Sequence, residues 1–110
     1  MRTTSKYRNV WTVYKGRKYQ SKAEANHAAH LDLMKSARGP EKVKRWKPQV
    51  RVPLKVNGKL VCTYVLDFHV HYEDGREEWH EVKGVMTDAA RIKIALFRAI
   101  YPDRALFIAR

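Results

Sequence analysis

Two turn signals that flank one long strand most constrain how this chain folds. Asn57-Gly58 is a strong two-residue hairpin turn, and the strand that follows it is predicted over Leu60 to Tyr72. Glu73-Asp74-Gly75 ends that strand, and the next strand is predicted over Glu77 to Lys83. We therefore expect neighbouring strands that are joined directly by hairpins.

The N-terminal part of the chain predicts a small hairpin followed by a helix. Short strands are predicted over Val10 to Tyr14 and Arg17 to Tyr19. Ser21 is a good N-cap with Glu24 three residues later, so a helix is predicted from there through Lys35. The helical stripe expected to face a sheet comprises Ala23, His27, His30, Leu31 and Met34.

The rest of the chain alternates strand and helix signals. Val43 to Leu54 is extended but irregular, and its prolines restrict it to an edge position or a broken strand. Thr87 or Asp88 caps a second helix, and Ala105 to Ala109 reads as a final strand. The apolar stripe expected on the second helix comprises Ile92, Ala95, Leu96, Ala99 and Ile100. We expect one α+β domain over residues 1–110.

The charge balance favours a polyanionic partner. Lys and Arg number 23 against 11 acidic residues, which gives a formal charge of +12, and nucleic acid is the first expectation for so basic a domain. A merely soluble basic domain is the alternative. No segment approaches the roughly 18 continuous apolar residues of a spanning helix, and no secretory signal follows Met1. The single Cys62 fits a reducing compartment, so a cytoplasmic location is expected.

Asp67 and Glu81 stand on two successive strands, and the loop between those strands decides whether they meet. A two-residue loop would set Asp67 opposite Val82 and turn the carboxylates to opposite faces. A three-residue loop, with its glycine at the left-handed position of a type I turn with a bulge, would set Asp67 opposite Glu81. Directly opposed carboxylates, with Cβ atoms about 5 Å apart, destabilise a sheet unless a cation lies between them. Lys83 helps to meet that need, but a divalent metal meets it better.

Two carboxylates beside a lysine suit metal-dependent phosphodiester hydrolysis. Mg²⁺, with Mn²⁺ as a substitute, takes oxygen ligands, polarises a phosphoryl oxygen and lowers the pKa of a bound water. Lys83 shares a face with Glu81 and is placed to hold or deprotonate that water, or to neutralise the transition state. The alternative is an ordinary solvated charge cluster across two strands.

The residues just described also resemble a known family. Asp67, then Glu81-Val82-Lys83, is similar to the signature of the PD-(D/E)XK nucleases. More closely, an ordered set of motifs over nearly the whole chain resembles a family of small phage and prophage proteins, formerly a domain of unknown function, that is assigned to this superfamily. These motifs are Ser5-Lys6-Tyr7-Arg8-Asn9, Tyr19-Gln20-Ser21-Lys22-Ala23-Glu24-Ala25, Tyr64-Val65-Leu66-Asp67-Phe68, Glu81-Val82-Lys83-Gly84 and Arg91-Ile92-Lys93.

The resemblance implies both a fold and an active site. It implies a restriction-endonuclease-like core, in which a mixed central sheet is flanked by two helices. It further implies that Asp67 and Glu81 bind Mg²⁺, with the Val82 backbone carbonyl as a further ligand, and that Lys83 is catalytic. One departure is that Leu66, and not proline, precedes the aspartate.

Glu24 has two interpretations. By resemblance it matches the helix glutamate that completes the active site in phage endonuclease I and the archaeal junction resolvases, which would make it a metal ligand and a catalytic residue. These relatives also make branched DNA the expected substrate. The alternative is a capping box, in which the Glu24 side chain returns to the Ser21 amide.

The basic residues predict contacts to backbone phosphates without base-specific readout, since no DNA-reading motif is visible. They group in the N-terminal arm and hairpin, on the extended segment around Trp46, and near the second helix. The candidates are Lys6, Arg8, Lys15, Arg17, Lys18, Lys44, Arg45, Lys47, Arg91 and Lys93. Each group has a solvated face as its alternative, and Trp46 is more often a core residue than a base-stacking platform.

The sequence also gives expectations about oligomeric state, zinc binding and alternative functions. A small monomer can cut one strand, so paired cleavage would require a homodimer; no organic cofactor and no membrane partner are expected. His27 with His30, or His69 with His71, would bind zinc only with further ligands. The alternatives to a DNA endonuclease are a non-catalytic basic nucleic-acid-binding phage protein and a ribonuclease.

Overall fold

A four-stranded mixed sheet forms the centre of the molecule. The structure, a computed structural model, describes residues 11–110. The sheet has the order β3-β4-β5-β6, in which the first three strands are antiparallel and β6 lies parallel to β5. Its strands are β3 (Val43–Val56), β4 (Lys59–Tyr72), β5 (Glu77–Val82) and β6 (Ala105–Ala109). Since β3 lies at an edge, the predicted edge position of this proline-containing segment is confirmed.

Both predicted hairpin turns are present. Asn57 and Gly58 have φ angles of 52° and 78°, the left-handed pair that a two-residue turn between twisted strands requires. At the second turn the Gly75 amide donates to the Tyr72 carbonyl at 3.0 Å, and the Tyr72 amide donates to the Arg76 carbonyl at 2.9 Å. Gly75 has a φ of 94°, so this is the three-residue loop with a left-handed glycine.

The second hairpin fixes the register that the candidate site needs. Phe68 pairs with His80, and His69 pairs with Trp79. One further step along this antiparallel ladder sets Asp67 opposite Glu81. The register expected from a three-residue loop is therefore confirmed, and the two-residue alternative, with Asp67 opposite Val82, is excluded.

The long β3–β4 hairpin bends at Asp67. In the β3–β4 ladder, Pro48 pairs with Phe68 and Val50 with Leu66, so Gln49 stands opposite Asp67. Gln49 has a φ of 53°, a left-handed conformation that is uncommon for a residue with a side chain. The strand pair therefore changes direction at the level of Asp67.

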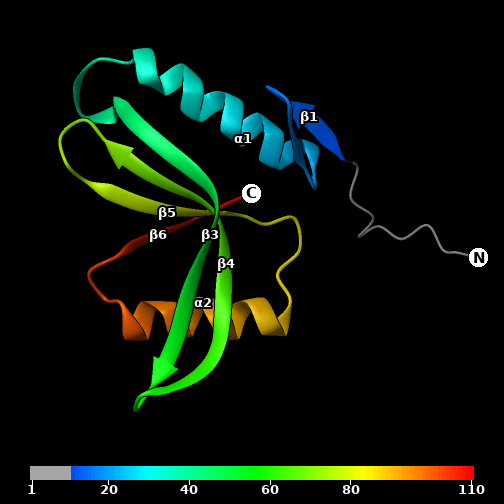
Figure 1. The fold of residues 1–110 in the computed structure, drawn as a ribbon, viewed down its shortest axis with the longest axis vertical. Helices are drawn as coiled ribbons and strands as arrows, with labels where there is room; N and C mark the ends of the chain where they lie inside the picture. The colour runs from blue at the N-terminus through cyan, green and yellow to red at the C-terminus, as the bar shows by residue number, and fades with distance from the viewer. Residues whose placement is uncertain (1–10) are drawn as a thin grey trace, which may run out of the picture.

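The bend divides the hydrophobic core between two helices. Tyr64 and Leu66, before the bend, belong to a cluster with Phe97 of α2 (Asp88–Ile100). Phe68 and Val70, after it, belong to a cluster with residues of α1 (Lys22–Leu33). In Figure 1, α1 and α2 accordingly lie against different ends of the β3–β4 ribbon. One face of β4 therefore contributes to both clusters.

The predicted core stripe of α1 is wrong in part. Its buried residues are Glu24, Ala25, Ala28 and Leu31, whereas Ala23 and His30 are exposed. The helix is rich in alanine and polar residues, so its sequence has little hydrophobic periodicity from which to choose a face. A short 3₁₀ turn, Met34–Ser36, continues it.

The predicted stripe of α2 is also rotated from the observed one. Thr87 caps the helix by accepting a hydrogen bond from the Ala90 amide at 3.1 Å. The buried residues are Ala90, Ile94 and Phe97, while Ile92 is 66% exposed. Of the predicted stripe, Leu96 and Ile100 are partly buried and Ala95 and Ala99 are exposed. Phe97, the single aromatic residue of the helix, lies on the buried face.

Asp32 of α1 ties the N-terminal hairpin to the sheet. The hairpin consists of β1 (Thr12–Tyr14) and β2 (Arg17–Tyr19); Val10, the predicted start of its first strand, lies outside the described residues. The Asp32 carboxylate accepts from the Tyr14 hydroxyl at 2.6 Å and from the Trp46 indole at 2.9 Å. Burial opposes its ionisation, but these hydrogen bonds prevail and lower the pKa of Asp32 to about 2. Trp46 is thus a packed structural residue, as predicted.

Candidate functional site

Asp67 is fixed at the bend of β4 by the backbone of β5. Its Oδ2 atom accepts a hydrogen bond of 2.7 Å from the Val82 amide. The β4–β5 backbone pairing is last seen at Phe68 and His80, so the Asp67 side chain continues the connection between these strands beyond the ladder. One carboxylate oxygen is therefore held by the fold.

Glu81 lies opposite Asp67 and is almost fully buried. It is 4% exposed. Its Oε2 atom accepts a hydrogen bond from the Tyr64 hydroxyl at 3.2 Å and forms an ion pair with the Lys83 ammonium at 3.1 Å. The predicted triplet of Asp67, Glu81 and Lys83 therefore comes together at the end of β5.

Tyr64 belongs both to the hydrophobic core and to the candidate site, although it was not among the predicted site residues. Its ring packs edge to face against Phe97, with the ring centroids 6.1 Å apart, and its hydroxyl reaches Glu81. A buried tyrosine needs a partner for its hydroxyl. This need was the one indication in the sequence that the Tyr64 hydroxyl would contact a polar residue, but it does not identify that residue.

Glu24 reaches the site from the first turn of α1. Its backbone amide donates to the Ser21 hydroxyl at 3.1 Å, so the predicted N-cap is formed. Its side chain is buried, and its Oε1 atom has no hydrogen-bond partner. Glu24 instead adds a negative charge beside the Asp67 carboxyl. The described geometry therefore brings this helix glutamate to the strand carboxylates.

Burial and mutual repulsion make the strand carboxyls hard to ionise. Burial, reinforced by the charge of Glu24, raises the pKa of Asp67 to about 6, although the Val82 amide opposes the rise. Burial, followed by the charge of Asp67, raises the pKa of Glu81 to about 7, against the effect of Lys83. The two carboxyls therefore hold protons to higher pH than exposed carboxyls do.

The donor set fits a hard cation. Glu81, like Glu24, has a buried Oε1 atom without a hydrogen-bond partner, and buried polar atoms normally have one. A divalent ion would satisfy such oxygens and offset the repulsion. Within residues 11–110, however, only His69, His71 and Glu77 have potential ligand atoms that all lie within 4.8 Å of one another. The carboxylate oxygens of Glu24, Asp67 and Glu81 therefore do not all lie within that distance of one another.

A pocket of about 240 Å³ opens beside the carboxylates. It is lined by residues of β4, the end of β5 and the start of α2, among them Tyr64, Glu81, Lys83 and Lys93. Two lysines thus face the same space as the Glu81 carboxylate. Such a pocket matches an anionic group that approaches a cation held by the carboxylates.

The predicted phosphate-binding residues lie in several places. Lys44, Arg45 and Lys47 are exposed on β3, and Lys15, Arg17 and Lys18 are exposed on the N-terminal hairpin, where Lys15 is 3.4 Å from Asp32. Lys93 lines the pocket beside Glu81, whereas Arg91 lines a separate one with Arg98 and Arg110. Lys6 and Arg8 lie outside the described residues.

The two histidine pairs considered for zinc differ in structure. His27 forms a 2.8 Å hydrogen bond with His80, and burial lowers the pKa of His27 to about 4, while His30 is exposed. His27 and His30 therefore have separate surroundings. His69 and His71 stay together and gain Glu77 as a neighbour.

Neither helix within residues 11–110 has the length and apolar character needed to cross a membrane.

Comparison with known proteins gives one family. No curated protein and no solved structure matches the chain. A family described as "Protein of unknown function (DUF1064)" matches residues 4–110. Because this match covers nearly the whole sequence, including every candidate residue of the carboxylate site, the chain belongs to the DUF1064 family.

Proposed function

We propose that this protein is a metal-dependent DNA endonuclease with a PD-(D/E)XK-type active site. The observation that carries the proposal is the meeting of Asp67 and Glu81 on adjacent strands, with the Lys83 ammonium 3.1 Å from Glu81. Burying two mutually repelling carboxyls costs stability, so a functional role accounts for them better than a stabilising one. The resemblance of the ordered motifs to a family of small phage and prophage proteins assigned to this nuclease superfamily supports the same proposal.

Asp67 and Glu81 are the residues that would hold Mg²⁺, with Mn²⁺ as a substitute. Magnesium in proteins commonly uses one or two carboxylates together with waters and substrate phosphate, which agrees with two neighbouring carboxylates beside an open pocket. Glu24 and the Val82 carbonyl are the proposed additional ligands. When bound, the ion supplies Lewis-acid polarisation of the phosphodiester and a more acidic water.

The remaining residues of the site orient the two carboxylates and neutralise charge on the phosphate. The Val82 amide fixes one oxygen of Asp67, and the Tyr64 hydroxyl fixes one oxygen of Glu81. Lys83 is 25% exposed at its side chain and lines the pocket, so it is placed to hold the attacking water or to neutralise charge on the phosphoryl oxygens. Lys93, on the same pocket, is placed to hold the phosphate of a bound strand.

The charge of the chain supports DNA as the substrate. A formal charge of +12 and exposed basic residues on β3 and the hairpin suit recognition through phosphates and shape. Branched DNA, met in a bacterial host cytoplasm during phage recombination, replication or packaging, is the proposed substrate by analogy with the junction resolvases. Paired cuts then require two copies of the chain.

Nicking of supercoiled plasmid and of a four-way junction, with and without Mg²⁺ or Mn²⁺, tests the proposal. We expect metal-dependent cuts and faster cleavage of the junction than of a linear duplex with the same sequence. DNA binding without cutting would favour the non-catalytic alternative, which the same basic surface supports. A matched RNA junction in parallel separates a deoxyribonuclease from a ribonuclease.

A further inference from the structure

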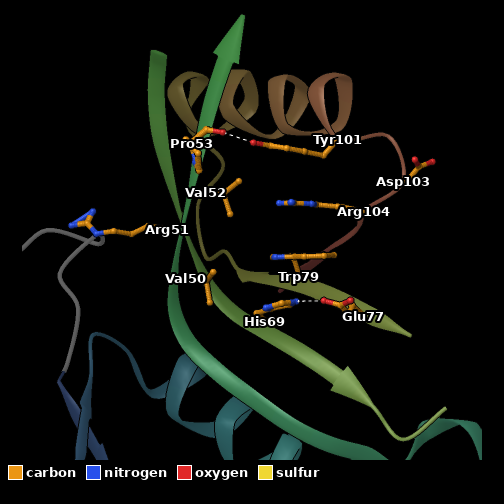
Figure 2. Close-up of a pocket in the computed structure, with 10 residues that line it drawn as sticks. All are labelled: Val50, Arg51, Val52, Pro53, His69, Glu77, Trp79, Tyr101, Asp103 and Arg104. Carbon is orange, nitrogen blue, oxygen red and sulfur yellow. Dashed lines mark hydrogen bonds and ion pairs between the residues drawn. The ribbon is translucent and has the colours of Figure 1, made fainter. Parts of the chain in front are cut away.

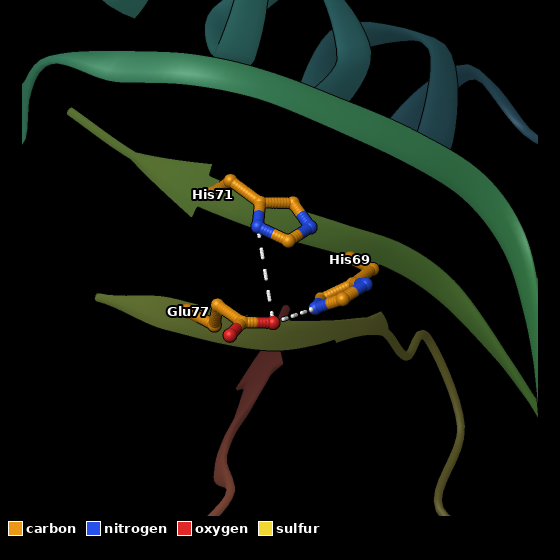
Figure 3. A group of neighbouring side chains, drawn as sticks. All are labelled: His69, His71 and Glu77. Carbon is orange, nitrogen blue, oxygen red and sulfur yellow. Dashed lines mark hydrogen bonds and ion pairs between the residues drawn. The ribbon is translucent and has the colours of Figure 1, made fainter. Parts of the chain in front are cut away.

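His69, His71 and Glu77 form a second group of potential ligands on the sheet. His69 and His71 are two residues apart on β4, and therefore point to one face. Glu77 on β5 pairs directly with His71, which brings its side chain to the same face. Figure 3 shows the two imidazoles and the carboxylate turned toward one another.

The spacing of these ligand atoms suits a small transition-metal ion. The Glu77 Oε1 atom lies 2.8 Å from His69 Nε2 and 3.8 Å from His71 Nδ1, and all the ligand atoms lie within 4.8 Å of one another. Ligands of tetrahedral zinc, at bond lengths of roughly 2.0 to 2.1 Å, stand about 3.3 Å apart. The two measured distances lie on either side of that value.

The surroundings hold the first imidazole in place. The His69 ring stacks on Trp79, with the ring centroids 4.4 Å apart and the planes at 12°. Arg104 lies over the same indole at 5.1 Å and over Tyr101 at 4.1 Å. Figure 2 shows these four side chains in successive layers along one wall of a pocket of about 670 Å³. A ligand whose ring is already oriented loses little freedom when a metal binds.

We propose that His69, His71 and Glu77 bind one divalent transition-metal ion of the zinc class. Two imidazoles and one carboxylate are ligands that zinc accepts, and three protein ligands leave a fourth position open for water or an anion. His69 and Glu77 line the pocket of about 670 Å³, so this position is accessible. The site uses other residues than the carboxylate site: on β5 Glu77 is four residues from Glu81, roughly 13 Å at the usual strand rise, and on β4 His69 is two residues from Asp67, roughly 7 Å.

A simpler reading of the cluster is a cross-strand hydrogen bond between His69 and Glu77 without any metal. Such a pair would leave the three side chains with no more affinity for zinc than scattered surface histidines have. The two readings therefore differ in the affinity and stoichiometry of zinc and in the residues on which binding depends.

The test is a metal titration of untagged protein that has been stripped with a chelator. Calorimetry with Zn²⁺ should give one tight site per chain, and Co²⁺ should give the visible absorption of a tetrahedral complex with the same stoichiometry. Glu77→Gln and His71→Ala should each weaken zinc binding at least ~10-fold, since loss even of outer-shell partners has effects of that size. Because Glu77 is exposed, Glu77→Gln should keep the fold, which circular dichroism of the stripped variant checks.

Two control variants connect the binding to this cluster. His30→Ala removes an exposed histidine elsewhere, and Glu81→Gln removes a carboxylate of the other site; both should leave the tight zinc site unchanged. Absence of a tight site in the parent protein overturns the proposal. Binding that survives both Glu77→Gln and His71→Ala, or that is lost in Glu81→Gln, also overturns it, because the zinc then lies elsewhere. None of these outcomes depends on nuclease activity.

Discussion

The Asp67 carboxylate accepts a 2.7 Å hydrogen bond from the Val82 amide, and this contact joins the bend of β4 to the end of β5. The charge of Glu24 acts on the Asp67 carboxyl, and the charge of Asp67 acts in turn on the Glu81 carboxyl. Asp67 therefore has a structural role through one oxygen and an electrostatic role through its charge. Substitutions can separate the two.

Asp67→Asn should remove the charge and keep a hydrogen-bond acceptor for the Val82 amide. We expect metal-dependent cleavage to fall at least ~100-fold, while urea denaturation without metal shows little loss of stability. Asp67→Ala should lose cleavage equally and also lower the free energy of unfolding by about 1 to 3 kcal/mol, because the Val82 amide loses its charged partner. Equal stability of the two variants would contradict the structural role.

Ser21 and Glu24 should have separable effects, although both belong to the start of α1. Ser21→Ala should lower the free energy of unfolding by about 1 kcal/mol through loss of the cap and leave the Mg²⁺ dependence of cleavage unchanged. Glu24→Gln should keep the fold and raise the Mg²⁺ concentration needed for cleavage. A Glu24→Gln variant that loses stability but keeps its metal dependence would show that Glu24 is only part of a capping box.

Lys83→Met keeps much of the side-chain volume and removes the ammonium from the pocket. We expect the cleavage rate to drop by roughly 10² to 10³, the usual effect of removing one group that stabilises developing charge. DNA affinity, measured by fluorescence anisotropy in Ca²⁺, should change little because one phosphate contact among many is lost. Lys55→Met, on the exposed part of β3, is the matched control and should cleave normally; a variant that binds DNA poorly would make Lys83 a binding residue only.

The metal-free protein should lose stability as the pH rises from about 4 to about 7. The pKa values of Asp67 and Glu81, about 6 and about 7 in the folded state, lie above their ordinary values of 3.8 and 4.5. At these two groups the folded state binds more protons than the unfolded chain in this window, which lowers the free energy of unfolding as the pH rises and levels off above it. The lowered pKa of His27, about 4, acts in the opposite direction, but it is one group against two. Urea denaturation across this range should show a shallower slope for Glu81→Gln. An unchanged slope would mean that Glu81 is not the group that holds the proton.

Local turn chemistry made much of the fold predictable. Asn57-Gly58 and Glu73-Asp74-Gly75 specify their hairpins through residues that adopt left-handed conformations, and register follows from loop length. The Ser21 and Thr87 caps were likewise visible. These are short-range effects that one sequence window contains.

Tertiary relationships were harder to predict. The predicted buried faces of both helices were wrong in part, because α1 is rich in small residues and α2 buries Ile94 and Phe97 while Ile92 is exposed. The left-handed Gln49, which bends β3 opposite Asp67, follows no residue preference that the sequence displays. Tyr64 at Glu81 and Glu77 beside His69 depend on cross-strand neighbours, and therefore on the register of the assembled sheet.

The most direct test of the proposed active site compares three proteins on one supercoiled plasmid with Mg²⁺. The parent protein should nick the plasmid, Glu81→Gln should be at least ~100-fold slower, and Glu77→Gln, the same change four residues earlier on β5, should nick at the parent rate. Circular dichroism and thermal unfolding should show all three folded. Nicking by Glu81→Gln at the parent rate, or no metal-dependent nicking by the folded parent protein on plasmid or junction, would contradict the proposed active site.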